Sequence, residues 1–343
     1  MRTVTPARSE ISATITSRRD RLPVVLWAAA AVLLATAVSV RHAGVLWAAR
    51  ATAEPFVILA AIIAASVLAG RLGLFRALAG VLIRDRAPRP VAASSVLAFT
   101  ALLAGLVNLD VAAVVAMPVA MAAAARHHLP VGRLAVAVAI TANAASFLLP
   151  TANITTLLLV GRLHLAALAY LRGSWAPWLL VVTVTVGALT GWVTQTGAGA
   201  DAAACARHPR RAVPSGRAAL DLIPLYIAAA SIRALLAAGI TLRGGLTAQL
   251  AVGSGLTCLI NNLPAAAALR PATSAGLRAA VLATAIGPGL LITGSVATVI
   301  CRRIARDFGA ALRAWRFTLI GSVLVPVQLA VAVAGLTLTG ALR

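Results

Sequence analysis

The sequence contains no lysine and only eight acidic residues among 343. Its 30 basic residues are therefore all arginines, and the formal net charge is +22. The arginines stand in short segments between apolar runs, not along one face, which argues against nucleic-acid binding. Cysteine is also scarce, because Cys205, Cys258 and Cys301 show neither a CxxC spacing nor a nearby histidine pair. We therefore expect no disulfide framework, no metal site and no cofactor.

Apolar residues are what the chain has in abundance. Hydrophobic residues make up 61% of the sequence and charged residues 11%, and the mean hydropathy is +0.96. Ordinary water-soluble domains do not reach these values. We predict an all-α polytopic membrane protein. Residues 1–23 carry five arginines and lack a cleavage pattern, so we interpret them as a cytoplasmic N-terminal tail and not as a signal peptide.

The apolar runs predict about seven transmembrane helices plus two re-entrant hairpins in an inverted repeat. A first span and loop occupy residues 24–53, and a linker occupies residues 195–220. The two repeats share the order span, hairpin, broken helix, span. The predicted segments are repeat 1 at 54–194, with hairpin 91–125, broken helix 134–160 and span 175–193, and repeat 2 at 221–343, with hairpin 246–270, broken helix 277–304 and span 317–338.

Interruptions inside apolar runs support this order. Residues 91–125 are broken at Asn108-Leu109-Asp110 and at Pro118, and at about 1.5 Å per residue they are too long for one crossing and short for two. The second hairpin is broken at Asn261-Asn262-Leu263-Pro264. The broken helices are interrupted at Pro150-Thr151-Ala152-Asn153, and at Gly287-Pro288-Gly289 and Gly294-Ser295.

The distribution of arginines predicts the orientation. With the N-terminus inside, 21 arginines fall in inner segments and 8 in outer ones, while Arg233 lies within a span. Because arginines favour the cytoplasmic side, we expect a multi-pass protein of the cell (inner) membrane with a cytoplasmic N-terminus. The first hairpin then opens to the cytoplasm and the second to the outside.

Asp110 is the one acid deep in an apolar run, where an ionised carboxylate costs several kcal/mol unless it is solvated or paired. It could carry a proton, or it could cap the helix that follows it. Helix breaks leave free N–H and C=O groups that can hold a solute, although a lone proline kink would hold none. The candidate substrate or ion-binding residues are Asn108, Asp110, Asn143, Thr151, Asn153, Asn261, Asn262, Gly294 and Ser295.

Four ordered motifs resemble the ion transporter superfamily, in particular its arsenical pump membrane protein (arsenite permease) and citrate transporter-like branch. They are Asn108 to Pro118, Ala142 to Asn153, Ile260 to Pro264 and Ile286 to Thr298. The resemblance implies inverted repeats, an elevator mechanism and a site between the hairpin tips and unwound helices. The chain departs from the family at Leu109, Ile154 and Leu291-Ile292, and its linker replaces additional scaffold helices.

We therefore predict a secondary transporter, with proton-coupled efflux of arsenite or a similar small oxyacid as the leading function and Asp110 as the proton carrier. A sodium- or proton-coupled dicarboxylate or citrate carrier is the alternative. A non-transporting membrane partner or degenerate paralogue is an alternative of another class. We expect no enzyme, since no apolar run pairs a nucleophile with a His or Lys base. The expected partners are the lipid bilayer, a small anion or oxyacid and a proton or sodium ion, with a homodimer as an option.

Overall fold

The computed structural model describes residues 22–84, 86–162, 165–195 and 222–341. Most of the predicted tail and nearly all of the predicted linker lie outside these residues. Within them the chain is helical, and its only extended pairing is an isolated bridge between Ile240 and Leu269. The prediction of an all-α polytopic membrane protein is confirmed.

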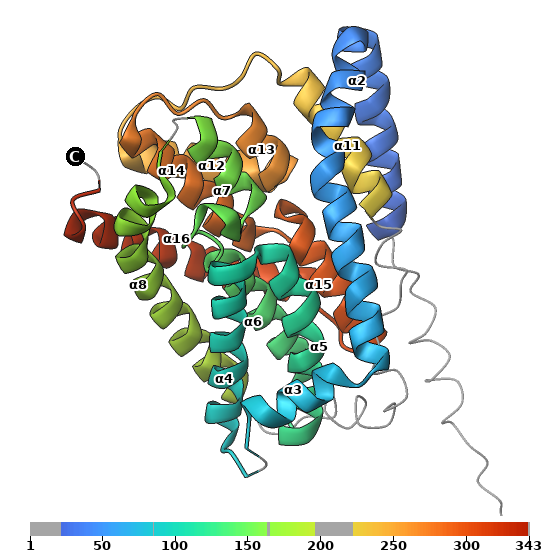
Figure 1. The fold of residues 1–343 in the computed structure, drawn as a ribbon, viewed down its shortest axis with the longest axis vertical. Helices are drawn as coiled ribbons and strands as arrows, with labels where there is room; N and C mark the ends of the chain where they lie inside the picture. The colour runs from blue at the N-terminus through green and yellow to red at the C-terminus, as the bar shows by residue number, and fades with distance from the viewer. Residues whose placement is uncertain (1–21, 85, 163–164, 196–221, 342–343) are drawn as a thin grey trace, which may run out of the picture.

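The chain begins with α2 (Leu22–Arg71), which is not one straight helix. Arg41 has non-helical angles (φ −142°, ψ 42°), and Figure 1 shows the two arms of α2 side by side. Ala37 and Ala48, one from each arm, share a small apolar cluster with Ala234 of α11 (Leu222–Leu235). Within the predicted first span and loop, residues 24–53, the only break in the helix is therefore a turn at Arg41.

Two antiparallel helical arms occupy the region of the first predicted hairpin. After α3 (Leu74–Leu82), α4 (Arg89–Leu102) passes into a π-helical turn, η1 (Leu103–Val107), and the chain reverses at Asn108 into α5 (Leu109–His127). The predicted interruption at Pro118 is wrong, because α5 continues through it. Neighbouring helices can support the backbone groups that a proline frees in a membrane helix.

The first broken helix has a wide gap. Helix α6 (Val131–Ala144) ends before a short 3₁₀ turn, η2 (Pro150–Ala152), and α7 (Ile154–Arg162) follows. The next helix, α8 (Ala167–Thr194), begins eight residues before the predicted position 175, and it tolerates Pro177 in its interior. The break therefore lies where the sequence places it, but it extends further toward the N-terminus.

The second half also contains a helical reversal and a broken helix. Helix α11 has 14 described residues, about 21 Å at 1.5 Å per residue. It is followed by the bridge between Ile240 and Leu269. The second hairpin is α12 (Leu246–Ile260) and α13 (Asn262–Ala268). The remaining elements are α14 (Ser274–Ile286), η4 (Gly287–Leu290), η5 (Ile292–Gly294), α15 (Val296–Asp307) and α16 (Ala314–Leu338).

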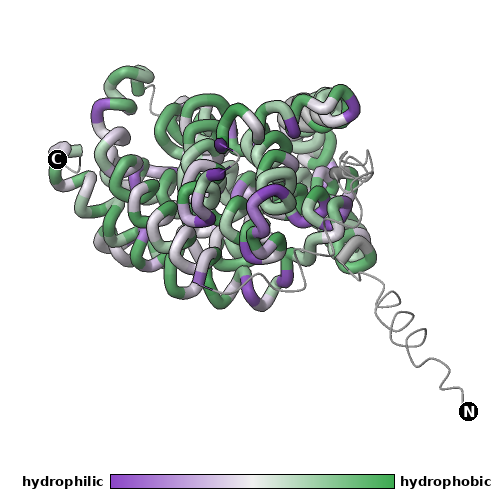
Figure 2. Tube along the Cα trace, turned by 90° about the horizontal axis from the view of Figure 1, so that it is seen from below, coloured by the Kyte–Doolittle hydropathy of each residue, from purple (hydrophilic) through white to green (hydrophobic). Residues whose placement is uncertain are grey.

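Five helical segments of the described chain are long and apolar enough to cross a membrane, or six if the bent pair Ile63–Arg71 and Leu74–Leu82 is one span. This is fewer than the seven predicted, and each arm of the first hairpin is itself 19 residues long. In Figure 1, α4 and α5 occupy the lower half and α12 to α14 the upper half. Figure 2 shows mostly hydrophobic helices, with hydrophilic residues in short stretches.

Small residues let the helices that surround the breaks approach closely. A Cβ at Gly321 of α16 would collide with the carbonyl oxygen of Gly289 in η4. Gly335 lies near the C-terminus of α16, and a Cβ there would be 2.7 Å from the backbone nitrogen of Pro177 in α8. Close backbone contact is typical of helix association in membranes. Helix α16 is therefore held against both the second break and α8.

Candidate functional site

A small pocket lies where the two hairpins meet the two broken helices. Its volume is about 30 Å³, and four helices begin at it: α5, α7, α13 and α15. The lining residues are Phe56, Leu109, Asp110, Asn153, Ile154, Thr155, Asn262, Leu263, Ser295 and Val296. Phe56 comes from α2, and every other lining residue belongs to the first turn or the N-cap of one of these helices.

Asn108 and Asn261 hold the two hairpin tips in the same way. The side-chain oxygen of Asn108 accepts from the N–H of Asp110 at 2.8 Å, and that of Asn261 accepts from the N–H of Leu263 at 3.3 Å. Their amide nitrogens donate to the Thr151 carbonyl at 3.2 Å and the Thr293 carbonyl at 2.9 Å. Each asparagine thus caps one helix and ties its hairpin to the break that follows in sequence.

The two tips differ in backbone conformation. Asn108 is extended (φ −171°, ψ 150°), whereas Asn261 has φ 75° and ψ 153°. Residues with a side chain rarely adopt the backbone angles of Asn261, which are found almost only in glycine. The tip of the second hairpin is therefore under local strain, next to a residue of the pocket.

We expect Asn261→Val to destabilise the protein by about 1–3 kcal/mol more than Asn261→Gly does. Both variants remove the same two hydrogen bonds, but only glycine accepts the backbone angles without strain. Thermal unfolding of the detergent-solubilised protein, followed by the fraction that stays monodisperse, measures the difference. Equal stability of the two variants would contradict the strained tip.

A buried polar network lies behind the pocket and joins the two halves of the chain. The amide nitrogen of Asn143 donates to the Thr298 hydroxyl at 2.8 Å, across 155 positions of sequence. Asn153 donates to the Ser146 hydroxyl at 3.1 Å, and that hydroxyl donates to the Asn143 carbonyl at 2.8 Å. The network fixes the end of α6 against α15 and against the N-cap of α7.

Two hydroxyls of the pocket lack a partner within the part of the chain that the structure describes. Thr155 and Ser295 are each 1% exposed, and neither hydroxyl oxygen has a hydrogen-bond partner there. Buried polar groups are ordinarily satisfied, so these two hydroxyls are available to a molecule that enters the pocket. The side-chain oxygen of Asn153 is already used, because it accepts from the N–H of Thr155 at 3.0 Å.

Asp110 is the acidic residue of the pocket. It lies in the first turn of α5, where the positive end of the helix dipole favours a negative charge. No arginine or histidine is among the residues that line the pocket with it. The N-terminus of α5 is therefore the positive partial charge nearest to this carboxylate, and a proton or a cation that enters the pocket could also balance its charge.

The structure brings together four of the nine residues predicted for the site. Asp110, Asn153, Asn262 and Ser295 line the pocket. The other five lie around it without lining it. Asn108 and Asn261 cap the hairpin tips, Thr151 offers its carbonyl to Asn108, Asn143 bonds to Thr298, and Gly294 packs against Pro288.

The sequence prediction did not include Phe56, Leu109, Ile154, Thr155, Leu263 and Val296 in the site. Thr155 could have been found from the sequence. It stands two residues after the N-cap Asn153, and side chains in the first turn of a helix lie beside its N-terminus. Phe56 carries no such signal, since it is one apolar residue in a long apolar helix. Cys258 lies outside the pocket lining, and its thiol contacts the Gly287 carbonyl at 3.3 Å.

Interrupted membrane helices whose ends meet at a small pocket with polar side chains are typical of secondary transporters. Comparison with protein families agrees: the model described as "Citrate transporter" (CitMHS) matches residues 11–268, well over half of the chain. The chain belongs to this citrate transporter family. Among curated proteins, none matches the chain. The family match supports the citrate transporter-like side of the resemblance seen in the sequence, and it does not extend to the arsenite permease side.

Proposed function

We propose that this protein is a proton-coupled secondary transporter of small carboxylate anions, with citrate as the first substrate to test. The observation that carries the proposal is the convergence of α5, α7 and α15 on one pocket that also holds Asp110. In this mechanism the three helix N-termini attract the anion, and the hydroxyls of Thr155 and Ser295 donate hydrogen bonds to it. Asp110 takes up the proton that accompanies it.

The dipoles of these helices support an anionic substrate. Each N-terminus presents N–H groups that have no partner within the helix, together with a partial positive charge. The helices have 19, 9 and 12 residues, so each has a full first turn to contribute. Because no arginine lines the pocket, these partial charges replace a fixed cation, which suits a substrate that must be released again.

The size of the pocket supports a mechanism in which it opens. A volume of about 30 Å³ holds about two water molecules and is too small for citrate. Phe56 is the one lining residue from outside the hairpins and broken helices, and its ring packs edge-on against Tyr226 of α11 at 5.5 Å. We infer an elevator movement in which α2 and α11 stay in place while the hairpins and broken helices move past Phe56.

A second candidate is efflux of arsenite or a similar small neutral oxyacid. The same 30 Å³ and the absence of a basic lining residue favour it, because a neutral hydroxide needs little room and no counter-charge. In that case Asp110 would still carry the coupling proton. The neutral oxyacid would be bound mainly by the side-chain amide of Asn262 and not by helix dipoles. The two candidates differ in the charge of the solute.

Reconstitution into liposomes tests the proposal. We expect labelled citrate to enter proteoliposomes when the outside is acidic, and a pH-sensitive dye inside to report proton entry in step with it. A protonophore should remove the accumulation. Citrate flux that ignores the pH gradient would refute proton coupling, and movement of arsenite without citrate would select the second candidate. Vesicles that move neither solute would point to the non-transporting alternative.

A further inference from the structure

A second, larger pocket lies at the corner between α3 and α4, on the side of the molecule where the first hairpin has its base. It has a volume of about 580 Å³. Its walls include Leu82, Ile83, Val91 and Ser95, together with the arginines Arg84 and Arg86. This open pocket has an apolar wall and two guanidinium groups. It therefore differs in chemistry from the pocket that Asp110 lines, which has no basic residue.

The surrounding structure has the features expected at a membrane surface. The chain bends by 81° between Ile63–Arg71 and Leu74–Leu82, so that α3 runs across the bundle (Figure 1). Phe75 and Ala79 of α3 are buried in one cluster with Val119 of α5, whereas Val81 is 85% exposed. A short amphipathic helix packed sideways on the end of a bundle is typical of the lipid interface.

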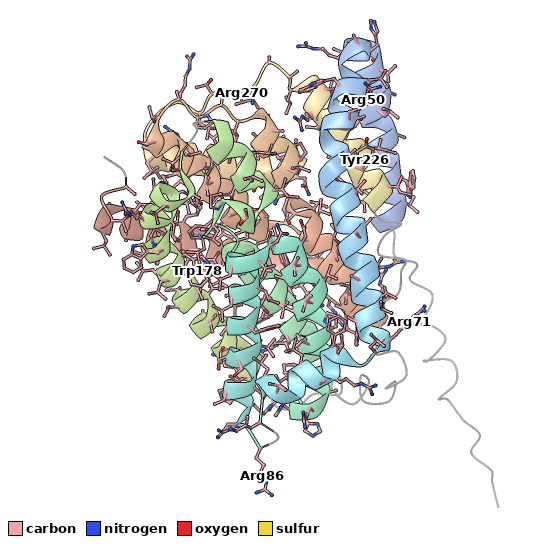
Figure 3. The ribbon with its side chains drawn as sticks, in the orientation of Figure 1. Arg50, Arg71, Arg86, Trp178, Tyr226 and Arg270 are labelled. Atoms are coloured by element: carbon pink, nitrogen blue, oxygen red, sulfur yellow. The ribbon has the colours of Figure 1, made fainter. Side chains whose placement is uncertain are left out.

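Positive charge concentrates at the same corner. Arg84 and Arg86 are exposed, and Figure 3 shows Arg86 projecting away from the helices at the lower edge of the molecule. Arg89 follows and donates to the His128 carbonyl at 2.8 Å. Residues 84–89 contain three arginines and one acid, Asp85, which lies outside the described residues. The formal charge of this segment is therefore +2.

The start of α4 adds to this charge. Its N-cap is Pro88, whose side chain cannot accept a hydrogen bond, and Pro90 in the first turn has no N–H, which leaves the N–H groups of Arg89 and Val91. Val91 lines the pocket. A helix N-terminus and two guanidinium groups together suit a phosphate, which arginine binds through paired hydrogen bonds. The apolar wall beside them suits an acyl chain.

We propose that this pocket, formed by the end of α3, the loop with Arg84 and Arg86, and the start of α4, binds the headgroup of an anionic phospholipid. The phosphate lies between Arg84, Arg86 and the N-terminus of α4, and the first acyl carbons lie against Ile83 and Val91. Because α4 leads directly to the hairpin tip at Asn108, the lipid is bound at the base of the element that carries one wall of the transport pocket.

Lipid binding to the purified full chain tests the proposal. We expect native mass spectrometry in detergent to show about tenfold stronger retention of phosphatidylglycerol than of phosphatidylcholine with the same acyl chains. The double variant Arg84→Gln and Arg86→Gln should lose this preference, and Arg84→Lys with Arg86→Lys should keep a large part of it. Arg50→Gln with Arg243→Gln removes the same charge at exposed positions elsewhere and should bind like the wild type.

Three results would overturn the proposal. The glutamine double variant could retain phosphatidylglycerol like the wild type, phosphatidylcholine could bind as well as phosphatidylglycerol, or inorganic phosphate at the same concentration could displace the lipid, which would indicate a site for free phosphate. If the double variant is not monodisperse, Arg84→Gln alone carries the same comparison, because Arg84 lines the pocket and is exposed, so that its loss should not disturb the fold.

Discussion

Replacing Asp110 by asparagine is expected to abolish proton-coupled transport, lowering the initial rate of uptake by about a hundredfold or more. Asparagine has nearly the same shape, and the N–H of residue 110 would keep its bond to Asn108, so the hairpin tip should stay folded. The change removes the one carboxylate of the pocket and with it the group that can exchange a proton. Uptake by proteoliposomes under an imposed pH gradient measures the loss.

The controls separate a transport role from a structural one. Asp307→Asn removes a carboxylate at the far end of α15 and should leave uptake close to the wild-type rate. Asp110→Glu keeps the carboxyl group and should restore part of the coupled flux. If Asp110 only capped α5, then Asp110→Asn would transport like the wild type, and its uptake would still follow the pH gradient.

The positions at which helices break or reverse were the part of this fold that the sequence could predict. Prolines, glycines and paired asparagines inside apolar runs indicated the reversals at Asn108 and Asn261 and the breaks before Ile154 and Val296. These residues change the local backbone whatever surrounds them. Proline alone was a weaker guide, because α5, α8 and α16 each contain one without stopping. Whether a proline ends a membrane helix depends on neighbours that the local sequence does not reveal.

The direction in which polar side chains point was not predictable. Asn108 and Asp110 stand two positions apart, yet one caps a helix and the other lines the pocket. Asn143 has its partner at Thr298, in the other half of the chain. Phe56 enters the site only because α2 packs beside the hairpins. These assignments depend on packing between distant elements, and no local pattern encodes them.

Gly321→Ala is expected to destabilise the protein by about 2 kcal/mol, even though alanine is the better helix former. A methyl group at this position would collide with the Gly289 carbonyl oxygen and approach the Gly289 carbonyl carbon to 2.9 Å. Because both atoms are backbone, α16 or η4 must move. The temperature at which the solubilised protein loses monodispersity measures the effect, and uptake should fall as the second break shifts.

Gly187→Ala provides the matched control. It makes the same substitution in another long helix, α8, where a Cβ would meet nothing within 4 Å. This variant should be as stable as the wild type or slightly more stable, since only the gain in helix propensity remains. If Gly321→Ala were as stable as Gly187→Ala, α16 would not be held in close contact with η4.

The hydrogen bond between Asn143 and Thr298 has a consequence for how the protein is made. Asn143, Asn153 and Thr155 belong to the first half of the chain, but the residues that they face, Ser295 and Thr298, exist only when residues 295–298 have been synthesised. Until then a polar face must be sheltered from lipid by water or by the insertion machinery. Newly made chains that stop before α15 should therefore depend on that shelter and be removed by membrane proteases, whereas chains that include α15 can close the face themselves.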